Sequence, residues 1–493
     1  MKKFLLGFLV FLGLLMGMEL VFRLSAALFH WPGSAISPEK TVTQHKLWQQ
    51  HLFSNFLGVH SPDPYLLWKF KPHLYRSIFV TNSRGTLGTE FKVEKPPDTY
   101  RILLLGDSSP VGLGLKSRKE AFGEQFLELL KQNYPDRKLE LINASVSGYT
   151  SAQGLIWFLK YGVKLRPDLL LIHFGNNDAS YNGYLEDKEI LPKSLWVADL
   201  QSILGNSAIY QSLRAFFVPL KEKVLGGRRR TEARLTVRVS DQNYLENLQE
   251  ILEAARKVGT NTILVTVPVP REWPPAIEFK PFVNLKTAAG DLVMAEQSRN
   301  TLSAEIAYCL DWSEIRRKYP QIDYWTLNVL RRVYVDSGNP DSGIFKYQSR
   351  LANNPGDVSS LNNLSVLYWR KGDLVKSLQY ITQALGKDST NAILHYNLGM
   401  IEKRLGDTLS AEEEFEKAKE LDFYSLRTKK AYNNKISELA SVSNLPLIDL
   451  DSLFLANNSE FLFIDHCHPT AEGHRLIAQA LLERLERTGW LKD

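Results

Sequence analysis

The chain has 493 residues, of which 44% are hydrophobic and 11% aromatic, so it can form two or three packed domains and is not disordered. Its 60 basic and 54 acidic residues give a net charge of only +6, and the two signs are mostly interspersed, which argues against a nucleic-acid partner. Its two cysteines, Cys309 and Cys467, exclude a disulfide framework and a cysteine-based zinc site, and a single bridge between them stays open.

The amino terminus has the pattern of a membrane anchor. After two lysines, the apolar run Phe4–Met18 continues past Glu19 to Phe22. The uninterrupted part is shorter than the roughly 20 residues that span a bilayer, which leaves a cleaved signal peptide as the alternative. We expect an uncleaved single-pass anchor over residues 1–26, because Glu19 and Arg23 make a poor cleavage region. The positive-inside rule then exports the rest of the chain, into the periplasm if the protein is bacterial.

Residues 27–99 contain turns and short extended pieces. Leu66–Phe70 and Ser77–Thr81 have strand composition, and we expect them to pair with each other. This lead-in segment would join the anchor to the domain that follows.

The next segment predicts a buried strand that ends at a serine. Ile102–Leu105 is an apolar run without helical period, and Gly106 ends it, so the strand delivers Ser108 to a tight turn. At the carboxyl end of a strand in an α/β sheet, free backbone N–H groups bind ligands, and a serine there suits a nucleophile. For this motif alone, a Ser/Asp turn that caps a helix is the alternative.

Two further predicted strands end in polar motifs. Leu139–Ile142 leads into Asn143–Gly148, and Leu169–Phe174 leads into Gly175–Asp178. Parallel strands would bring these motifs to the same sheet edge as the serine.

Amphipathic helices are predicted between and after these strands, at Phe122–Asn133, Gln153–Leu165 and Leu245–Val258, and a further strand at Thr262–Val269. Strands that alternate with such helices indicate an α/β fold, in which a parallel sheet is covered by helices on both faces. Residues 179–240 interrupt this order, and we expect an irregular excursion over the strand ends.

The aromatic residues of the excursion are Tyr181, Tyr184, Trp196, Phe216 and Phe217, and the segment also holds the basic cluster Arg228–Arg230. The aromatic residues would either shape a substrate pocket or pack under a long loop. For the arginines, contact with an anionic headgroup or polysaccharide and simple solvation are both open.

A 34-residue period follows. Two sets of residues recur at this spacing: Gly338, Gly372 and Gly406, and Leu330, Leu364 and Leu398. The pattern resembles tetratricopeptide repeats, with two complete units over 357–423 and a degenerate one before them. The concave face of such repeats usually binds a peptide or protein partner, and a purely structural lid is the alternative. The block would be inserted between one strand of the sheet and the next.

After the repeats, Lys429–Ala440 predicts a helix and Leu445–Leu450 a strand. The polar motif Asp465–His468 then precedes an amphipathic helix at Ala471–Arg487.

The four polar motifs, in this order, resemble those of the SGNH (GDSL) hydrolase family. In that family the first block supplies a serine, the second a glycine, the third an asparagine and the last an Asp-x-x-His pair. The resemblance implies the roles of nucleophile, two oxyanion donors, orienting carboxylate and base for Ser108, Gly148, Asn177, Asp465 and His468. Two departures from the pattern, at Pro110 and Ser145, would alter the shape of the pocket without touching the triad.

The chemistry agrees with these roles. Ser108 is inert at its own pKa and needs a base within hydrogen-bond reach, which His468 supplies while Asp465 holds its tautomer. Attack on an ester builds negative charge on the carbonyl oxygen. The N–H groups of Ser108 and Gly148 and the amide of Asn177 would stabilise it as an oxyanion hole.

The remaining polar residues are given no catalytic role. We expect His466 and His474 at the surface or behind the catalytic residues, His173 as a satisfied core residue, and Asp107 and Asp178 as braces of their turns. No metal or cofactor is expected, because no His/Glu pair has helical ligand spacing.

The first hypothesis is a membrane-anchored, extracytoplasmic serine esterase that hydrolyses carboxylic ester or O-acyl bonds through an acyl-enzyme. The alternatives are an O-acyltransferase of envelope glycans and a non-catalytic scaffold in which the repeats bind a partner. The hypothesis divides the chain into five parts: an anchor at 1–26, the lead-in at 27–99, hydrolase residues 100–310, repeats at 311–425 and further hydrolase residues at 426–493.

Overall fold

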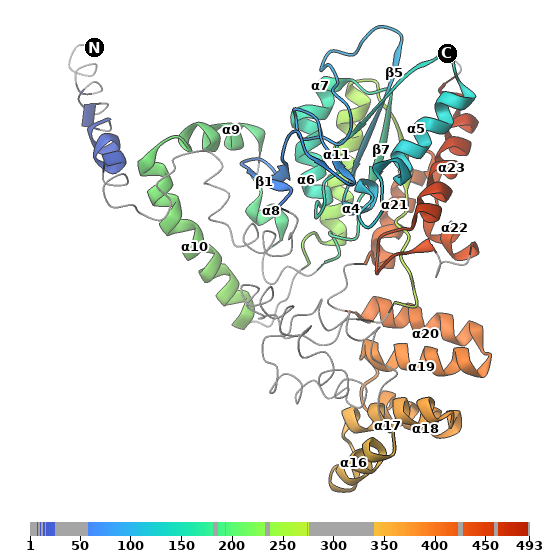
Figure 1. The fold of residues 1–493 in the computed structure, drawn as a ribbon. Coiled ribbons are helices and arrows are strands. Elements are labelled where there is room, and N and C mark those ends of the chain that lie inside the picture. The colour runs from blue at the N-terminus through green and yellow to red at the C-terminus, as the bar shows by residue number, and fades with distance from the viewer. Residues whose placement is uncertain are drawn as a thin grey trace.

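The computed structural model describes residues 7, 10, 13–14, 16–24, 58–180, 186–192, 194–231, 237–273, 275, 340–422, 427–457 and 462–491 (Figure 1). Within these residues, a five-stranded sheet has the order β6-β5-β7-β8-β9. Its strands are β5 (Thr99–Gly106), β6 (Lys138–Asn143), β7 (Leu169–His173), β8 (Asn261–Val265) and β9 (Leu447–Ile448). All neighbouring pairs are parallel, as predicted.

Alternate residues of the central strand enter two separate cores. Leu103 and Leu105 lie in one core, and Ile102 and Leu104 lie in the other. All four are at most 1% exposed, and each fully buried leucine or isoleucine contributes about 1.5–3 kcal/mol to folding. The sheet is therefore covered on both faces, which explains why β5 is an unbroken apolar run rather than an alternating one.

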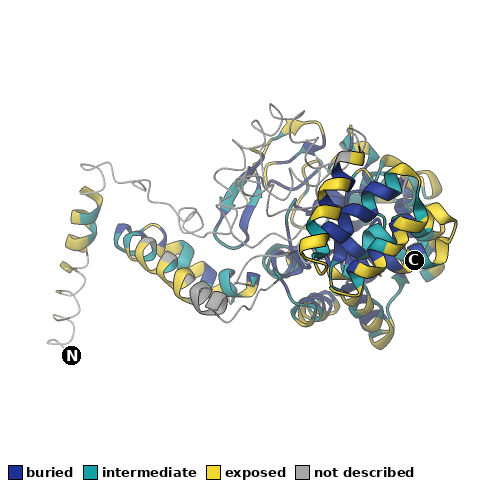
Figure 2. Ribbon diagram, turned by 90° about the horizontal axis from the view of Figure 1, so that it is seen from below, coloured by how far each residue is buried: buried dark blue, intermediate teal, exposed yellow. Residues whose placement is uncertain are grey.

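Helices from distant parts of the chain cover the two faces. One core is closed by α6 (Ser151–Trp157), α11 (Asp241–Lys257) and α21 (Lys430–Ser443), and the other by α5 (Phe122–Asn133), α22 (Leu450–Ala456) and α23 (Ala471–Thr488). In Figure 2, single helices carry both buried and exposed residues, as helices that cover a core do. The predicted α/β architecture is confirmed.

The helix predicted at Gln153–Leu165 is divided, because the π-helix η2 (Phe158–Gly162) separates α6 from α7 (Val163–Leu165).

The lead-in segment forms two local hairpins. In the first, β1 (His60–Asp63) pairs with β2 (Leu67–Phe70), and in the second β3 (Tyr75–Arg76) pairs with β4 (Phe79–Val80). The predicted pairing of the two longer pieces with each other is wrong. The reason is the turn after Asp63, whose carboxylate accepts the N–H groups of the second and third residues after it.

The excursion is helical rather than irregular, so that prediction is also wrong. It contains α8 (Asp187–Ile190), α9 (Leu195–Leu204) and α10 (Ala208–Thr231). Apolar residues at 213, 216, 217 and 220 have the three- and four-residue spacing of a helix, which the mixed composition of the segment obscures.

The predicted anchor lies largely outside the described residues. Of residues 1–26, the structure describes 7, 10, 13–14 and 16–24, and these are helical. Among all described helices, none combines the length and apolar character needed to cross a membrane.

In the described part of the repeat region, residues 340–422, five helices lie between β8 and β9. They are α16 (Pro340–Asn353), α17 (Val358–Lys371), α18 (Leu374–Leu385), α19 (Ala392–Leu405) and α20 (Thr408–Leu421). Gly372 and Gly406 end α17 and α19 with φ values of +81° and +89°, a conformation that favours glycine. The need for this helix end in each unit accounts for the glycine period seen in the sequence. Gly338 lies outside the described residues.

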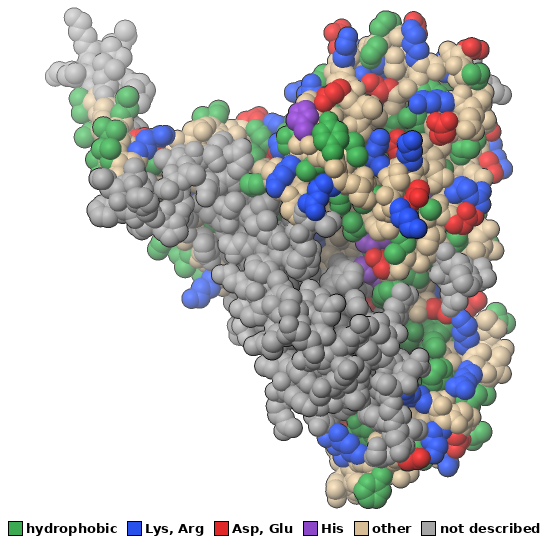
Figure 3. All heavy atoms as spheres, viewed as in Figure 1, with side chains coloured by type: hydrophobic (Ala, Val, Ile, Leu, Met, Phe, Trp, Pro, Cys, Tyr) green, Lys and Arg blue, Asp and Glu red, His purple; other side chains and the backbone are tan. Residues whose placement is uncertain are grey.

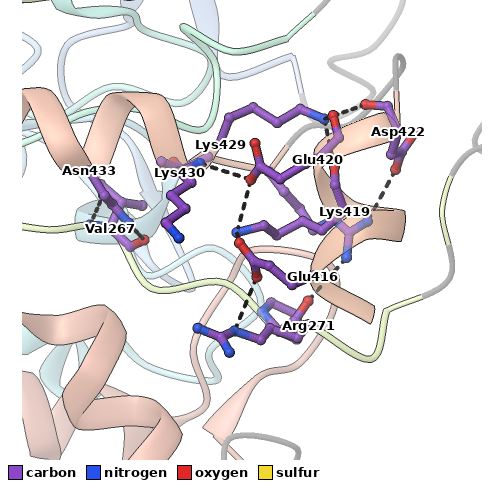
Figure 4. Close-up of polar contacts among 12 residues, drawn as sticks. Val267, Arg271, Glu416, Lys419, Glu420, Asp422, Lys429, Lys430 and Asn433 are labelled. Atoms are coloured by element: carbon purple, nitrogen blue, oxygen red, sulfur yellow. Dashed lines mark hydrogen bonds and ion pairs between the residues drawn. The ribbon is translucent and has the colours of Figure 1, made fainter. Parts of the chain in front are cut away.

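A lysine joins the last repeat helix to the sheet domain. The Lys429 ammonium group donates to three carbonyl groups at the C-terminal end of α20, those of Lys419, Glu420 and Asp422, at 2.6, 2.8 and 2.7 Å (Figure 4). These carbonyls lack partners within the helix, and the helix dipole favours a cation at that end. Burial nevertheless lowers the pKa of Lys429 to about 8, against the opposing effect of the nearby carboxylates.

Arg427 makes the second connection. It is 1% exposed, pairs with buried Asp422 at 3.1 Å, and donates to the carbonyl groups of Pro270 and Trp273 at 3.1 and 3.0 Å. The loop after β8 is thereby fixed against the end of the repeats.

We expect Arg427→Met to destabilise the protein by about 3–5 kcal/mol, because it leaves Asp422 buried without this partner. Urea unfolding followed by circular dichroism would show a lower midpoint. The matched control is Arg475→Met, whose partner Glu472 is exposed, and its midpoint should equal that of the wild type. Equal midpoints for both variants would contradict the role of Arg427.

Candidate active site

Three turns meet at the carboxyl edge of the sheet. The register pairs Gly106 of β5 with His173 of β7, and Leu104 of β5 with Asn143 of β6. Beyond the strands, the Val146 N–H group donates to the Gly106 carbonyl at 3.1 Å. The motifs that follow β5, β6 and β7 therefore lie side by side, as the sequence predicts.

Ser108 begins the short helix α4 (Ser108–Val111) directly after β5. The preceding turn requires glycine, because a Cβ atom on Gly106 would lie 2.4 Å from Pro110 Cγ and 2.8 Å from the His173 carbonyl oxygen. Asp107 caps the helix by accepting the Ser109 N–H group at 2.9 Å. Ser108 is 8% exposed, so the turn holds its side chain at the base of a mostly covered site.

The carboxyl-terminal motif Asp465–His468 lies next to this serine in the fold, although His468 is 360 residues away in the sequence. His468 Nε2 lies 2.8 Å from Ser108 Oγ, and His468 Nδ1 lies 2.9 and 2.8 Å from the two carboxylate oxygens of Asp465. The loop is also fixed to the serine turn, since Ser109 Oγ donates to the Cys467 carbonyl at 3.3 Å. In the tautomer with hydrogen on Nδ1, the ring donates to Asp465 and accepts the Ser108 hydroxyl proton.

The carboxylate of Asp465 is held in its charged form. Burial raises its pKa, but the hydrogen bond and charge of His468, with the Cys467 N–H group at 3.0 Å, outweigh burial and hold the pKa well below its ordinary value. A charged Asp465 fixes the orientation of the imidazole and stabilises its protonated form.

Asn177, in the turn after β7, offers an unpaired donor. Its Nδ2 atom is buried and has no hydrogen-bond partner within the part of the chain that the structure describes. The neighbouring Asn176 is instead structural, since its side-chain oxygen accepts the N–H and hydroxyl groups of Thr428, both at 2.9 Å. A buried amide donor without a partner is costly in a folded protein, and a ligand oxygen can relieve that cost.

Gly148 lies in the turn after β6 with φ of +82°, a conformation that favours glycine. Its carbonyl accepts a 2.6 Å hydrogen bond from Arg238 Nη1. The adjacent Ser147 carbonyl accepts the Trp68 indole N–H at 3.1 Å. Two side chains therefore fix the two peptide groups that flank the Gly148 Cα, and the first of these contains the Gly148 N–H.

Arg238 and Trp68 were not among the predicted site residues. Arg238 is 7% exposed and forms a two-fold pair with the buried Asp187, with N···O distances of 3.1 and 2.8 Å. The only signal in the sequence was its place at the end of the excursion, where the chain re-enters the α/β order. Nothing there indicated which loop the arginine contacts.

The other titratable residues lie behind the site. Burial raises the pKa of Asp107 to about 6 and of Asp178 to about 7, and lowers that of His173 to about 4 and of His474 to about 3. Asp107 and Asp178 brace their turns, as expected.

One expectation for the histidines needs correction. His474 is fully buried and accepts the Phe122 N–H at Nδ1, so of the two positions expected for it, the surface and the layer behind the site, it takes the second. His173 is in the core, yet neither of its ring nitrogens has a hydrogen-bond partner among the described residues, so it is not satisfied as expected. His466, also buried, packs its ring 5.8 Å from that of His468.

Asp465, His466 and Cys467 place possible ligand atoms for a metal within 4.8 Å of one another. The donor set fits a metal poorly. Asp465 is already engaged by His468, and burial raises the pKa of the Cys467 thiol well above its ordinary value, which disfavours the thiolate that binds metals. Cys467 is a free cysteine, and Cys309, with which it could have paired, lies outside the described residues. Two aromatic residues of the excursion, Tyr181 and Tyr184, also lie outside the described residues.

Comparison with known families agrees with this geometry. A model of the GDSL-like lipase/acylhydrolase family matches residues 104–299, and a tetratricopeptide-repeat model matches residues 392–424. A search of curated proteins finds no significant match. The sheet region is thus similar to an ester-hydrolysing family, and the helical region is similar to repeats that take part in protein interactions.

Solved structures with related folds include TesA, which is 18% identical with a TM-score of 0.22 over 35% of this chain and 63% of that one. A lipase/acylhydrolase from Enterococcus faecalis is 12% identical, with a TM-score of 0.32 over 79% and 96%. A catalytic mutant of the acetylxylan esterase Axe2 from Geobacillus stearothermophilus is 12% identical, with a TM-score of 0.30 over 78% and 94%. The chain spans less than two thirds of TesA, and these similarities do not bear on its substrate.

Residues 104–299 are thus similar to a family of ester hydrolases, and the serine within them, Ser108, is hydrogen-bonded to His468.

We expect Arg238→Lys to lower kcat for p-nitrophenyl acetate by about 10²-fold with little change in KM, because a lysine cannot hold both Asp187 and the Gly148 carbonyl. The charge is kept, so the variant should remain folded, which circular dichroism checks. A kcat equal to that of the wild type would show that Arg238 only stabilises the fold.

We expect Asp178→Asn to change how stability depends on pH. Folded Asp178 keeps its proton up to about pH 7, whereas the unfolded residue loses it near 3.8, so its ionisation costs stability as pH rises through this range. The variant should gain stability relative to the wild type between pH 4 and pH 7. The urea midpoints of both proteins across this range measure the difference, and a constant difference would contradict the raised pKa.

Proposed function

We propose that the protein is a membrane-anchored, extracytoplasmic serine esterase that hydrolyses carboxylic ester or O-acyl bonds through an acyl-enzyme. The observation that carries the proposal is the continuous hydrogen-bonded series from Ser108 through His468 to Asp465. A hydroxyl alone is a weak nucleophile, and this series supplies both its base and the group that orients the base.

In the first half of the reaction, Ser108 Oγ attacks the ester carbonyl carbon while its proton passes to His468 Nε2. The oxyanion that forms would accept hydrogen bonds from the N–H groups of Ser108 and Gly148 and from Asn177 Nδ2. The unpaired state of that amide supports its role, because a donor that is already fixed and desolvated needs no rearrangement when charge develops. His468 then donates its proton to the leaving alcohol.

In the second half, His468 removes a proton from water, which attacks the acyl carbon. The bond from that carbon to Ser108 Oγ then breaks, the acid leaves, and His468 returns the proton to Ser108 Oγ. A sugar hydroxyl in place of water would give acyl transfer with the same residues. We favour hydrolysis, in agreement with the family match.

The extracytoplasmic location is proposed from the sequence. Two lysines before the apolar run Phe4–Met18 favour a cytoplasmic amino terminus and export of the remaining chain. The repeats are proposed to bind a protein partner, in agreement with the tetratricopeptide match.

We expect Ser108→Ala to abolish hydrolysis of p-nitrophenyl acetate and labelling by a fluorophosphonate. Asn177→Ala should lower kcat by about 10²–10³-fold and keep the labelling site, because it removes one donor to the oxyanion. Peptide mapping of the labelled protein identifies the modified residue. Labelling of any residue other than Ser108, or full activity of Ser108→Ala, would contradict the mechanism.

The same assay separates hydrolysis from transfer. The acid released and the acyl group captured by an added sugar are measured together, and hydrolysis predicts that release exceeds capture. A matched control is Ser349→Ala, which removes an exposed serine hydroxyl on the repeat helix α16 and should keep the activity.

A further inference from the structure

The helices α9 and α10 expose two apolar stripes away from the sheet. The nine side chains of these stripes are between 38% and 69% exposed, and they are Trp196, Leu200, Ile203 and Leu204 on α9 and Leu213, Phe216, Phe217, Leu220 and Val224 on α10. Single exposed apolar residues are ordinary, but a stripe of large ones on each of two consecutive helices marks an interaction surface. Figure 1 shows the pair as an arm between the N-terminal helix and the sheet domain.

Contacts on the other side of α9 keep its stripe facing outward. Ala198 is fully buried, and Asp199 accepts the Tyr65 hydroxyl at 2.6 Å and the Lys160 ammonium at 3.1 Å. These residues hold α9 against the lead-in hairpin and the π-helix region.

The N-terminal helix is attached at the corner between α9 and α10. The Glu19 carboxylate accepts the Ser207 hydroxyl at 2.7 Å and the Ala208 N–H at 2.8 Å, so it caps the first turn of α10. Residues 16–24 themselves expose Met16, Leu20, Val21 and Leu24, which are 52–74% exposed. Figure 3 shows exposed hydrophobic side chains on this helix and along the arm. The apolar surface of the arm therefore continues into the segment with the anchor pattern.

Cations flank the stripe on α10. At about 100° per residue, the stripe from Leu213 to Val224 covers one side of the helix, and Lys221 and Lys223 lie about 80° to either side of its centre. Both lysines are exposed. An apolar stripe bordered by lysines is typical of a helix that lies in the interface of an anionic bilayer, where the ammonium groups reach the lipid phosphates.

We propose that the arm formed by α9 and α10 lies on a bilayer that contains anionic lipid, with its two apolar stripes among the acyl chains. The continuity with the N-terminal helix and the flanking lysines favour lipid over a second copy of the chain, which would need no such cationic border. The proposal concerns a surface remote from Ser108 and holds whether or not the esterase mechanism is correct.

The test uses the full chain in vesicles of phosphatidylcholine and phosphatidylglycerol, some of whose acyl chains carry a nitroxide quencher. Cys309→Ser removes one thiol, and Cys467 is buried and does not compete for the label. An environment-sensitive fluorophore is attached at Phe217→Cys, or at Leu409→Cys on α20 as the matched exposed control. The label at 217 should lose most of its emission, and the label at 409 should keep it.

A third label, at Leu20→Cys, reports the N-terminal helix by itself. If the fluorophore at position 20 is quenched and the one at position 217 is not, the proposal is overturned, because the chain would then be bound to the membrane with its arm in water. Cross-linking of Phe217→Cys between two copies, without quenching, would overturn it in favour of self-association. Hydrolysis of p-nitrophenyl acetate is measured on each labelled protein, so a failed esterase and a failed lipid contact give different results.

Discussion

The parallel register of β6, β5 and β7 is the constraint on which the site depends. Backbone hydrogen bonds fix these strands so that their ends coincide, and three turns separated in sequence then lie at one edge. Gly106 lets the β5 turn approach its neighbours more closely than any side chain would permit. The serine, the turn of Gly148 and the amide of Asn177 owe their common location to this sheet.

The buried charges of the molecule serve to fix loops against one another. Arg238 connects the end of the excursion to the turn of Gly148, and Arg427 connects the repeats to the loop after β8. That loop carries Trp273, whose ring lies 6.0 Å from that of His466, and the His466 ring in turn lies 5.8 Å from that of His468. A buried ion pair adds little net stability but specifies one arrangement strongly, because each charge is costly without its partner.

Burial shifts the pKa values of the titratable groups around the site, so that the interior favours protonation states that water would not. Burial raises the pKa values of Asp107 and Asp178 and lowers those of His173 and His474, so these groups tend toward their neutral forms. Asp465 is the exception, because His468 and backbone N–H groups stabilise its charge. Of Asp107, Asp178 and Asp465, the one whose charged form is stabilised is the one that faces the His468 imidazole.

The sequence by itself determined the α/β class, the strands that carry the polar motifs, the repeat period and the residues that gather at the sheet edge. It could do so because strand burial, helix periodicity and turn glycines are local properties of the chain. It did not determine the hairpin pairing of the lead-in, since the turn after Asp63 closes a shorter loop than the one predicted. The helical spacing of the excursion is present in the sequence but obscured by its mixed composition, whereas the contact of Arg238 with the Gly148 turn was decided only by tertiary structure. Such contacts join residues far apart in the chain, and no local pattern specifies which loop a buried charge will meet.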